Sequence, residues 1–322
     1  MKVLITGATG YIGKYLIQTL RKKDYEVYCL VRPTSNITHL QGQEIKFVYG
    51  DLTNTSSLFE AVSEMDYIYH LAIAKNPRRI SAYYQVNHIG TENLIKACAE
   101  HNPHIKKFIY VSSLAAAGFS PDGKPLKESD PPHPVTHYGK SKLKGEEAVL
   151  NYKDRLPIVI LRPPTVYGPG NMFLDYLINI ITKGLKPSWK GYTSLCYIDD
   201  FINGLILISE NKKSESNIYF ISDGKTYSWK EIIDIITRLL NRKTMPLYIP
   251  HSLIVLASYV IPYLASAIKK PFFGNKLIEL RHLYWISDNS RIKWEFNFQS
   301  QFTLEDGLGL TLKNYQNGKR CS

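Results

Sequence analysis

The chain has 322 residues, of which 44% are hydrophobic and 21% charged, and it carries a formal net charge of +12. This is an ordinary globular composition with room for one large core or two unequal domains, and the absence of internal repeats and low-complexity runs excludes repeat architectures. The lysines are dispersed and no recognised nucleic-acid motif is present, so we assign the charge to a solvated surface and expect no nucleic-acid partner.

The chain opens with a predicted strand, a glycine-rich turn and a helix. The apolar residues 3–5 suit a strand buried on both faces, and a helical pattern of apolar residues follows the glycines. Gly7 can take backbone angles closed to other residues, Gly10 lets the backbone approach a pyrophosphate, and Gly13 lets the helix pack against the strand. The helix N-terminus offers N–H groups to phosphates. Three glycines at this spacing also occur in an ordinary strand-to-helix turn. The position of these glycines at the start of the chain favours the first half of a dinucleotide-binding fold.

The second predicted strand, residues 26–31, bears on the choice of dinucleotide. An NAD enzyme typically places a carboxylate about 18 residues after the last glycine, where it holds the ribose 2′-hydroxyl. Here that residue is Val31, and Arg32 follows. Without the acid a 2′-phosphate is not repelled, and the guanidinium offers it a forked contact, so we favour NADP over NAD. The alternative is that Arg32 stacks on the adenine or faces water and NAD is still accepted.

Strand-like runs then alternate with helical stretches. This alternation predicts an α/β fold with a Rossmann-like, doubly wound parallel sheet and right-handed crossovers. The predicted strands lie near residues 2–6, 26–31, 45–48, 67–71, 107–111 and 157–161.

Two serines, Ser112 and Ser113, end the predicted strand 107–111. Ligands of open parallel sheets bind outside the carboxyl ends of the strands, so a serine there is placed to hydrogen-bond a substrate oxygen. The alternative is a helix or turn cap.

Tyr138 and Lys142 are four residues apart on a predicted helix. Such residues project from one face with about 5–6 Å between their Cβ atoms. An ammonium beside a phenol lowers the pKa of the phenol towards the working pH, as a general acid or base requires. The alternative is a chance pair on an exposed helix, because the chain contains 23 tyrosines.

Residues 253–268 form an uncharged apolar segment that is followed by Lys269 and Lys270 and contains Pro262. The segment is shorter than the roughly 20 residues needed to span a bilayer. We expect a buried helix pair; the alternatives are a surface that touches a membrane or an apolar entrance for substrate.

Taken together, these motifs resemble the extended short-chain dehydrogenase/reductases of the NAD-dependent epimerase/dehydratase superfamily. Residues 30–35 and the late apolar segment look most like the dihydroflavonol-reductase-like and 3β-hydroxysteroid-dehydrogenase-like members. The matching segments, in the family order, are residues 6–13, 51–52, 70–72, 86–91, 111–113, 138–142, 162–170, 197–200 and 287–291.

The resemblance implies catalytic roles for four residues. Tyr138 would exchange a proton with the substrate oxygen, and Lys142 would lower its pKa and hold the nicotinamide ribose. Ser113 would orient the oxygen; it is preferred to Ser112 because the family counts five residues from this hydroxyl to a glycine, here Gly118. Asn87 would support the site, although a cap or a solvent-facing amide is the alternative.

The resemblance also implies a cofactor site. Asp51 and Leu52 would lie beside the adenine, while Leu71, Ala72 and Pro163 would flank the ribose and nicotinamide. The turn and first helical residues that would hold the dinucleotide are Gly7, Gly10, Tyr11, Ile12 and Gly13.

Departures from the family pattern narrow the chemistry. Sugar-nucleotide epimerases generally carry an arginine at the position of Thr193 and often an asparagine at that of Thr165, a residue expected to face the substrate. Dehydratases carry an Asp-Glu pair where Leu114 and Ala115 stand, so dehydration is disfavoured. Epimerisation remains the second hypothesis.

We therefore expect hydride transfer between NADP(H) and a secondary alcohol or ketone of low polarity. A diphosphate held by Arg281 or Arg291 would instead favour an epimerase, and a non-catalytic dinucleotide-binding sensor is a third reading. Family members commonly dimerise through helices that flank the site, so a homodimer or a monomer is expected.

The expected organisation is a dinucleotide-binding domain of residues 1–165, with 193–222 returning to it, and a substrate-binding region of residues 166–192 and 223–322. Four scattered cysteines, Cys29, Cys98, Cys196 and Cys321, lack metal-ligand spacing, so no metal is expected. Their pattern and a first strand beginning at residue 2 predict a reduced, cytoplasmic protein without a signal peptide.

Overall fold

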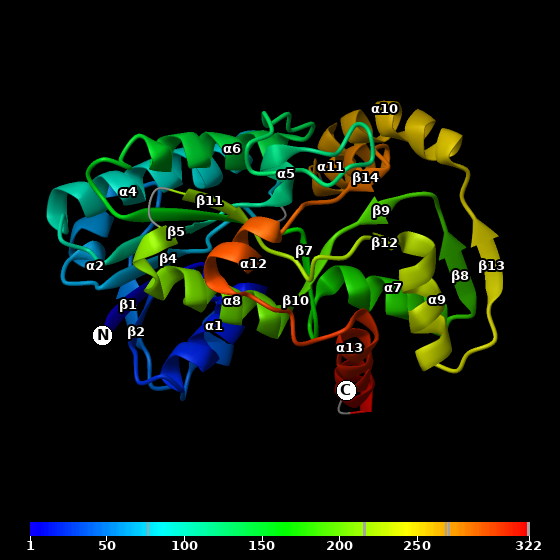
Figure 1. The fold of residues 1–322 in the computed structure, drawn as a ribbon, viewed down its shortest axis with the longest axis horizontal. Coiled ribbons are helices and arrows are strands. Elements are labelled where there is room, and N and C mark those ends of the chain that lie inside the picture. The colour runs from blue at the N-terminus through cyan, green and yellow to red at the C-terminus, as the bar shows by residue number, and fades with distance from the viewer. Residues whose placement is uncertain (76, 215–216, 268, 270, 321–322) are drawn as a thin grey trace.

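A computed structural model describes residues 1–75, 77–214, 217–267, 269 and 271–320. Ile268, Lys270 and Cys321 lie outside the described residues. The fold is built on a seven-stranded sheet in the order β11-β6-β5-β4-β1-β2-β3, in which every neighbouring pair is parallel (Figure 1). The predicted doubly wound parallel sheet is thus confirmed. Its strands are β1 (Lys2–Thr6), β2 (Glu26–Val31), β3 (Lys46–Tyr49), β4 (Tyr67–His70), β5 (Lys107–Val111), β6 (Ile158–Arg162) and β11 (Asn217–Phe220).

Helices cover both faces of this sheet (Figure 1). One face carries α1 (Tyr11–Arg21) and α8 (Ile198–Glu210), and the other carries α2 (Phe59–Val62), α4 (Gly90–His101) and α6 (His137–Leu150). Shorter helices, α3 (Ser81–Tyr84) and α5 (Leu114–Ala117), precede α4 and α6.

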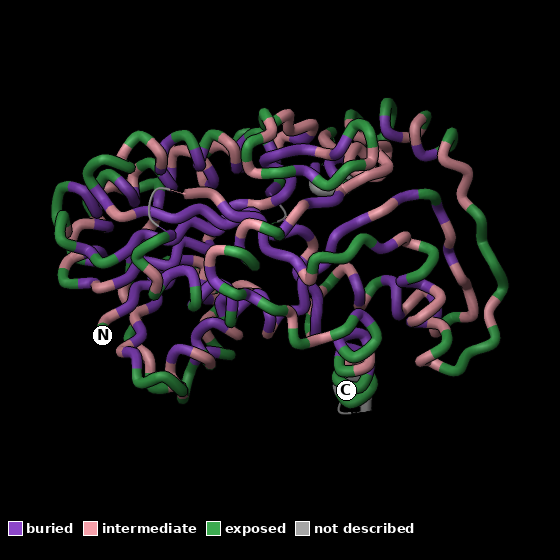
Figure 2. Tube along the Cα trace, viewed as in Figure 1, coloured by how far each residue is buried: buried purple, intermediate pink, exposed green. Residues whose placement is uncertain are grey.

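Alternate strand residues build two separate cores. In β1, Val3 and Ile5 belong to the cluster beneath α1 and α8, whereas Leu4 belongs to the cluster beneath α4. This follows from the two-residue period of a strand, which sends successive side chains to opposite faces. Both faces of β1 are therefore dry, as its continuously apolar sequence requires, and the central strands β1, β4, β5 and β6 appear largely as buried tube in Figure 2.

Three smaller sheets lie beyond the carboxyl edge of the large one (Figure 1); five further helices surround them, and another, α12 (Ser290–Phe296), packs against β11 of the large sheet. The sheets pair β7 with β10, β13 with β8, and β9 with both β12 and β14. The strands are β7 (Thr165–Tyr167), β8 (Leu185–Ser188), β9 (Tyr192–Thr193), β10 (Leu195–Tyr197), β12 (Tyr227–Ser228), β13 (Met245–Tyr248) and β14 (Tyr284–Trp285). The helices are α7 (Met172–Thr182), α9 (Trp229–Leu239), α10 (His251–Ala267), α11 (Pro271–Leu280), α12 (Ser290–Phe296) and α13 (Leu304–Arg320).

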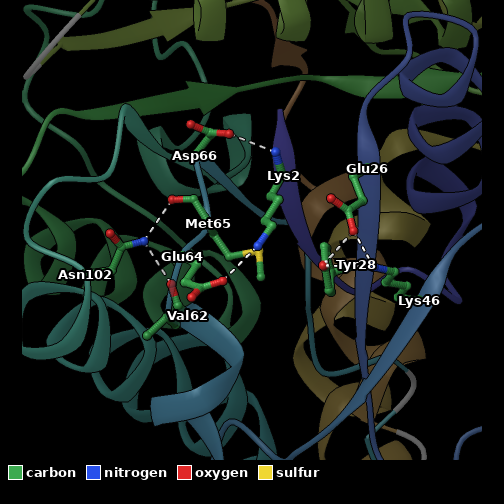
Figure 3. Close-up of polar contacts among 9 residues, drawn as sticks. All are labelled: Lys2, Glu26, Tyr28, Lys46, Val62, Glu64, Met65, Asp66 and Asn102. Atoms are coloured by element: carbon green, nitrogen blue, oxygen red, sulfur yellow. Dashed lines mark hydrogen bonds and ion pairs between the residues drawn. The ribbon is translucent and has the colours of Figure 1, made fainter.

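The amino edge of the large sheet is held by polar contacts (Figure 3). Lys2 joins β1 to the loop before β4: its backbone N–H donates to Asp66 at 2.8 Å and its ammonium meets Glu64 at 2.7 Å. Asn102 donates to the carbonyls of Val62 and Met65 at 2.9 and 2.8 Å. These contacts lie at the end of the sheet opposite the glycine turn, so they contribute to the fold and leave the carboxyl edge free for a ligand.

Candidate functional site

The glycine turn between β1 and α1 leaves no space for side chains. Gly7 has φ +73°, and an added Cβ would lie 2.7 Å from the backbone nitrogen of Ala72. An added Cβ at Gly13 would lie 2.5 Å from the carbonyl oxygen of Gly7. Gly10 donates its N–H to that same carbonyl at 2.9 Å. The turn is therefore drawn in tightly between β1, β4 and α1, as the sequence predicts.

The N-terminus of α1 fits a phosphate group. Gly10 precedes the helix and has no side chain to cap it, so N–H groups of the first turn are free to bind an anion. Tyr11 and Ile12 stand half-buried in that turn. Burial raises the pKa of Tyr11, whose buried hydroxyl has no hydrogen-bond partner among the described residues. A polar group left unpaired in this way suits a site that a ligand completes.

The ends of β2 and β3 place the predicted adenosine residues at one edge of the sheet. Arg32 is exposed, and its backbone N–H is fixed to the Ser35 hydroxyl at 3.1 Å. Asp51 follows β3 and accepts from both the N–H and the hydroxyl of Thr53 at 2.8 Å. Leu52 is buried and its carbonyl accepts from Asn93 at 2.8 Å. Within the described residues the Arg32 guanidinium has no ion pair, which leaves it open to a phosphate, while Asp51 and Leu52 are held in a fixed turn.

The ends of β4 and β6 bring Leu71, Ala72 and Pro163 to the same edge. Ala72 abuts Gly7, and its N–H donates to the Thr6 hydroxyl at 3.3 Å. The Pro163 carbonyl accepts from the N–H of Leu114, the first residue of α5, at 2.8 Å. The N–H of Leu71 donates to the Thr6 carbonyl at 3.1 Å, so all three residues are held at this edge, next in sequence to cavity-lining residues such as Ile73 and Pro164.

Ser112 and Ser113 point to different environments. The Ser112 hydroxyl donates at 2.5 Å to Glu146, which forms a buried ion pair with Arg162 at 2.6 Å. Ser113 caps α5, accepting from the N–H of Ala115 at 3.1 Å, and also hydrogen-bonds to Tyr138. Ser113 is thus a helix cap that also meets the tyrosine, whereas Ser112 is bound to the ion pair.

Tyr138 lies in the first turn of α6 beside Ser113. Thr136 caps this helix by accepting from the N–H of Gly139 at 3.0 Å. The Tyr138 ring meets that of Tyr83 edge-on, with centroids 6.1 Å apart. Burial raises the pKa of Tyr138 to about 12, and the hydrogen bond with Ser113 opposes this rise. In this structure, therefore, the pKa of the phenol lies above its ordinary value, whereas the sequence predicted a lowered one.

Lys142 is one turn further along α6 and fully buried. Its ammonium donates to the Val111 carbonyl at 2.8 Å and lies 4.0 Å from the centroid of the Tyr110 ring. Burial lowers the pKa of Lys142 to about 7, and the negative charge of Glu146 opposes this. The Val111 carbonyl of β5 thus holds the amine beneath the site. With the amine in this position, the pKa of Tyr138 is raised by burial and is not lowered by the lysine.

Asn87 occupies a π-helical turn, Gln85–Ile89, that leads into α4. It is fully buried; its amide donates to the Ser141 hydroxyl at 2.9 Å and its side-chain oxygen accepts from the Ala74 N–H at 2.9 Å. Neither a helix cap nor a solvent-facing amide describes this residue. It connects α6 to the chain after β4, and thereby positions the helix that carries Tyr138.

A cavity of about 370 Å³ brings Ser113, Tyr138 and Thr165 together. It opens between the carboxyl edge of the large sheet and the smaller sheets, and its walls are mainly apolar. The other residues that line it are Ile73, Ala74, Lys75, Tyr83, Leu114, Ala115, Pro164, Asn171, Phe173, Thr193, Trp229, Asn275, Lys276, Glu279, Leu280 and Trp285. No arginine is among them, and the cationic residues are two lysines.

The arginines considered for a diphosphate lie elsewhere. Arg291 is bound to Glu295 at 2.8 Å and to Asn217 at 2.7 Å. The guanidinium of Arg281 lies 5.2 Å from the ring centroid of Tyr259 in α10. Thr193 lines the cavity, but its hydroxyl donates to the carbonyl of Ser194 at 3.0 Å.

Sequence reasoning missed Tyr83 and Asn275, which form part of the cavity wall. Asn275 lies close enough to Tyr83 to oppose the rise in the phenol pKa that burial causes, but the Nδ2 group of Asn275 is buried without a hydrogen-bond partner within the described part of the chain. An unpaired donor facing a cavity is available to a ligand oxygen. Their separation in sequence left no local signal that they meet.

The NAD dependent epimerase/dehydratase family matches residues 3–222. A UDP-glucose 4-epimerase of Vibrio cholerae is 29% identical over 77% of this chain and 78% of its own. A decarboxylating sterol-4-alpha-carboxylate 3-dehydrogenase of Dictyostelium discoideum is 26% identical over 71% and 73%. The crystal structure of the UDP-glucuronic acid 4-epimerase of Bacillus cereus in complex with NAD superposes with a TM-score of 0.77 and 25% identity over 98% of this chain and 99% of that one.

These similarities confirm the resemblance drawn from the motifs. Relatives of the dihydroflavonol-reductase type and of the sterol-dehydrogenase type are both present. Reductases, dehydrogenases and epimerases all occur among them, so the similarities alone do not distinguish the substrate.

Proposed function

Because this chain belongs to the NAD-dependent epimerase/dehydratase family, and is an enzyme of its NAD(P)-dependent type, we propose that it transfers hydride between NADP(H) and a secondary alcohol or ketone of low polarity. The observation that carries the proposal is the cavity in which Ser113 and Tyr138 meet under apolar walls. We further propose that residues 1–165 with 193–222 hold the dinucleotide, and that 166–192 and 223–322 hold the substrate.

The residues at the carboxyl edge fit a dinucleotide. The turn at Gly7 and Gly10 and the first turn of α1, with Tyr11, Ile12 and Gly13, would receive the pyrophosphate, since no side chain obstructs it. Asp51 and Leu52 would lie beside the adenine, and Leu71, Ala72 and Pro163 beside the ribose and nicotinamide. When bound, the nicotinamide supplies or accepts the hydride.

The chain itself would handle the proton and the substrate oxygen. Tyr138 would exchange a proton with that oxygen, and Ser113, which already contacts the phenol, would orient it. Lys142 would hold a ribose hydroxyl and, on leaving the Val111 carbonyl, bring positive charge towards Tyr138. Asn87 is a positioning residue, because both ends of its amide are occupied by the protein.

The cavity walls favour a substrate of low polarity. Phe173 and Trp229 meet edge-on with ring centroids 5.4 Å apart, and Leu280 and Trp285 line the same cavity. An apolar wall with a few placed polar groups is typical of a small-molecule site. We propose that Thr165, which also lines the cavity, contacts the substrate together with Ser113 and Tyr138.

Turnover with a substrate panel tests this function. NADPH oxidation would be measured with apolar ketones, steroid-like ketones and nucleotide sugars, and we expect the ketones to be reduced. Interconversion of a nucleotide sugar without net loss of cofactor would establish the epimerase instead, and binding without turnover of any substrate would leave only the sensor. The epimerase is the second candidate because Lys75 lines the cavity, where it would meet a phosphate; Lys276 also lines the cavity but is paired with Glu279 at 2.6 Å.

Replacing Arg32 with alanine should weaken NADPH binding by about tenfold to a hundredfold, the value of a lost charged hydrogen bond, and leave NADH binding unchanged. The guanidinium of Arg32 is exposed, and the 2′-phosphate of NADPH is its only proposed partner. Dissociation constants from cofactor fluorescence measure the effect, with Arg155→Ala as an exposed control. An equal loss for both cofactors would contradict the NADP preference.

Replacing Asn275 with leucine should raise KM for the ketone by about fivefold to tenfold, because the free Nδ2 donor is the group available to the substrate. Steady-state kinetics separate this from a loss of kcat. Asn275→Ser, which retains a donor, should lose less. A KM that is unchanged by leucine would exclude substrate contact by this amide.

A further inference from the structure

Helix α10 presents an apolar outer face to solvent. Leu256 and Leu264 are 64% and 59% exposed, and Tyr263 is 79% exposed. Together with Leu253 and Val260 they recur at helical spacing, and we refer to these five residues as the outer apolar face. No charged residue lies between 252 and 267. Figure 2 draws α10 along the upper margin of the molecule, largely exposed or half-buried.

The opposite side of α10 packs on α11. Ile254, Ser258 and Ala265 are buried, and an added Cβ at Gly274 of α11 would lie 2.8 Å from the Cα of Pro262. The sequence predicts a buried helix pair within residues 253–268, and this expectation is wrong on two counts: residues 253–267 belong to one helix that continues through Pro262, and its outer face is exposed. The other side of α11 lines the cavity through Asn275, Glu279 and Leu280.

The apolar surface continues into β13. Met245 and Tyr248 are 64% and 67% exposed, and Leu247 is exposed between them. β13 ends three residues before α10 begins, so the two elements form consecutive exposed apolar segments. Large exposed apolar patches mark interaction sites rather than ordinary solvated surface, and the outer apolar face of α10 is such a patch.

The charge around this surface selects the partner. Residues 242–281 contain six lysines and arginines and one glutamate, and the whole chain carries +12. Lys269, just after α10, is exposed. A second copy of the chain would bring the same positive charge and be repelled, whereas an anionic lipid surface would be attracted.

We propose that the outer apolar face of α10 docks on a lipid bilayer that carries anionic headgroups. The helix has 17 residues, about 25 Å at 1.5 Å per residue, and would lie in the plane of the interface. None of the described helices is long and apolar enough to cross a membrane. The leucines and tyrosine enter the boundary between headgroups and acyl chains, and the neighbouring cations meet the lipid phosphates.

Docking would place the cavity close to the membrane. α11 is the element between them: one side packs on α10, and its residues Asn275 and Leu280 line the cavity. If the proposed function holds, an apolar substrate can reach the cavity from the lipid. Docking itself does not depend on that function, because it rests on the surface of α10 and its charge alone.

Co-sedimentation of the full chain with vesicles tests the docking. Vesicles of phosphatidylcholine alone and with phosphatidylglycerol are compared at low and high salt, without cofactor or substrate. We expect binding at least about tenfold stronger to the anionic vesicles, weakened by salt. Absence of binding to the anionic vesicles at low salt would overturn the proposal and leave the proposed function untouched, since no turnover is measured.

A matched pair of double variants locates the contact. Leu256→Ser with Leu264→Ser should reduce vesicle binding by about tenfold or more, because two exposed leucines lose their burial in lipid. Trp294→Ser with Leu310→Ser, which alters exposed apolar residues on α12 and α13, should bind like the parent chain. Equal binding by both variants would overturn the assignment to α10. The proposal would also be overturned if the parent chain did not bind vesicles and light scattering showed a dimer that only the α10 variant abolishes.

A third variant guards against misfolding of the double variant. Tyr263→Trp keeps an aromatic side chain at an exposed position. The emission of the introduced tryptophan should shift to shorter wavelength on anionic vesicles. Brominated acyl chains should quench the fluorescence of this variant more than that of the parent chain. Emission that is unchanged by the vesicles would contradict the docking.

Discussion

Replacing Tyr138 with phenylalanine is expected to lower kcat by about 10²-fold to 10⁴-fold, the usual cost of losing a general acid or base. The substitution removes only the hydroxyl that meets Ser113 and retains the ring that packs edge-on against Tyr83. The fold and the dinucleotide site should therefore persist. Initial rates of NADPH oxidation with the best ketone of the panel measure the effect.

Two controls accompany this variant. NADPH affinity should stay near that of the parent chain, and Tyr84→Phe, which removes a nearby hydroxyl that meets His137 at 3.0 Å outside the cavity, should keep most of the activity. If Tyr138→Phe turns over substrate at the parent rate, the phenol is not the proton-transfer group and the proposed mechanism fails.

Replacing Glu146 with alanine is expected to lower the free energy of unfolding by about 3–5 kcal/mol, because it leaves the Arg162 guanidinium buried without its partner. The pair is forked, with Arg162 Nε 2.9 Å and an Nη 2.6 Å from the two carboxylate oxygens, and both side chains are almost fully buried. Urea unfolding followed by circular dichroism measures the change.

A double variant that removes both charges shows whether the loss of stability arises from leaving Arg162 buried without its partner. Glu146→Leu with Arg162→Met removes both charges and should be more stable than Glu146→Ala. Glu305→Ala, which breaks the exposed pair with Arg238, should leave the unfolding curve nearly unchanged. A loss from Glu146→Ala no larger than that from Glu305→Ala would contradict a structural role for the buried pair.

The parts of the site that follow from local sequence were predictable. The six predicted strands all form within a residue or two of their expected bounds, since a strand buried on both faces reads as a short apolar run. The conformation of Gly7 and the tight packing at Gly13 follow from a turn that only glycine permits. The meeting of Ser113 with Tyr138 follows from parallel topology, which collects the strand ends at one edge.

The parts that depend on long-range packing were not predictable. Lys142 was expected beside the phenol, but β5 offers its carbonyl and the Tyr110 ring, and no sequence pattern specifies that choice. Tyr83 and Asn275 come from opposite halves of the chain and meet only in the cavity wall. The exposure of α10 was missed because an uncharged helix has the same composition whether protein, solvent or lipid covers it.

The alternation at the end of β5 makes its length important for the proposed activity. Ser112 contacts the buried ion pair and Ser113 lines the cavity, so adjacent residues would serve stability and the proposed chemistry separately. Deleting or inserting one residue in this strand would shift the register and exchange the two serines, even though the composition of the strand would scarcely change. We therefore expect insertions and deletions in this strand to be poorly tolerated, whereas exchanges of one apolar residue for another should be tolerated.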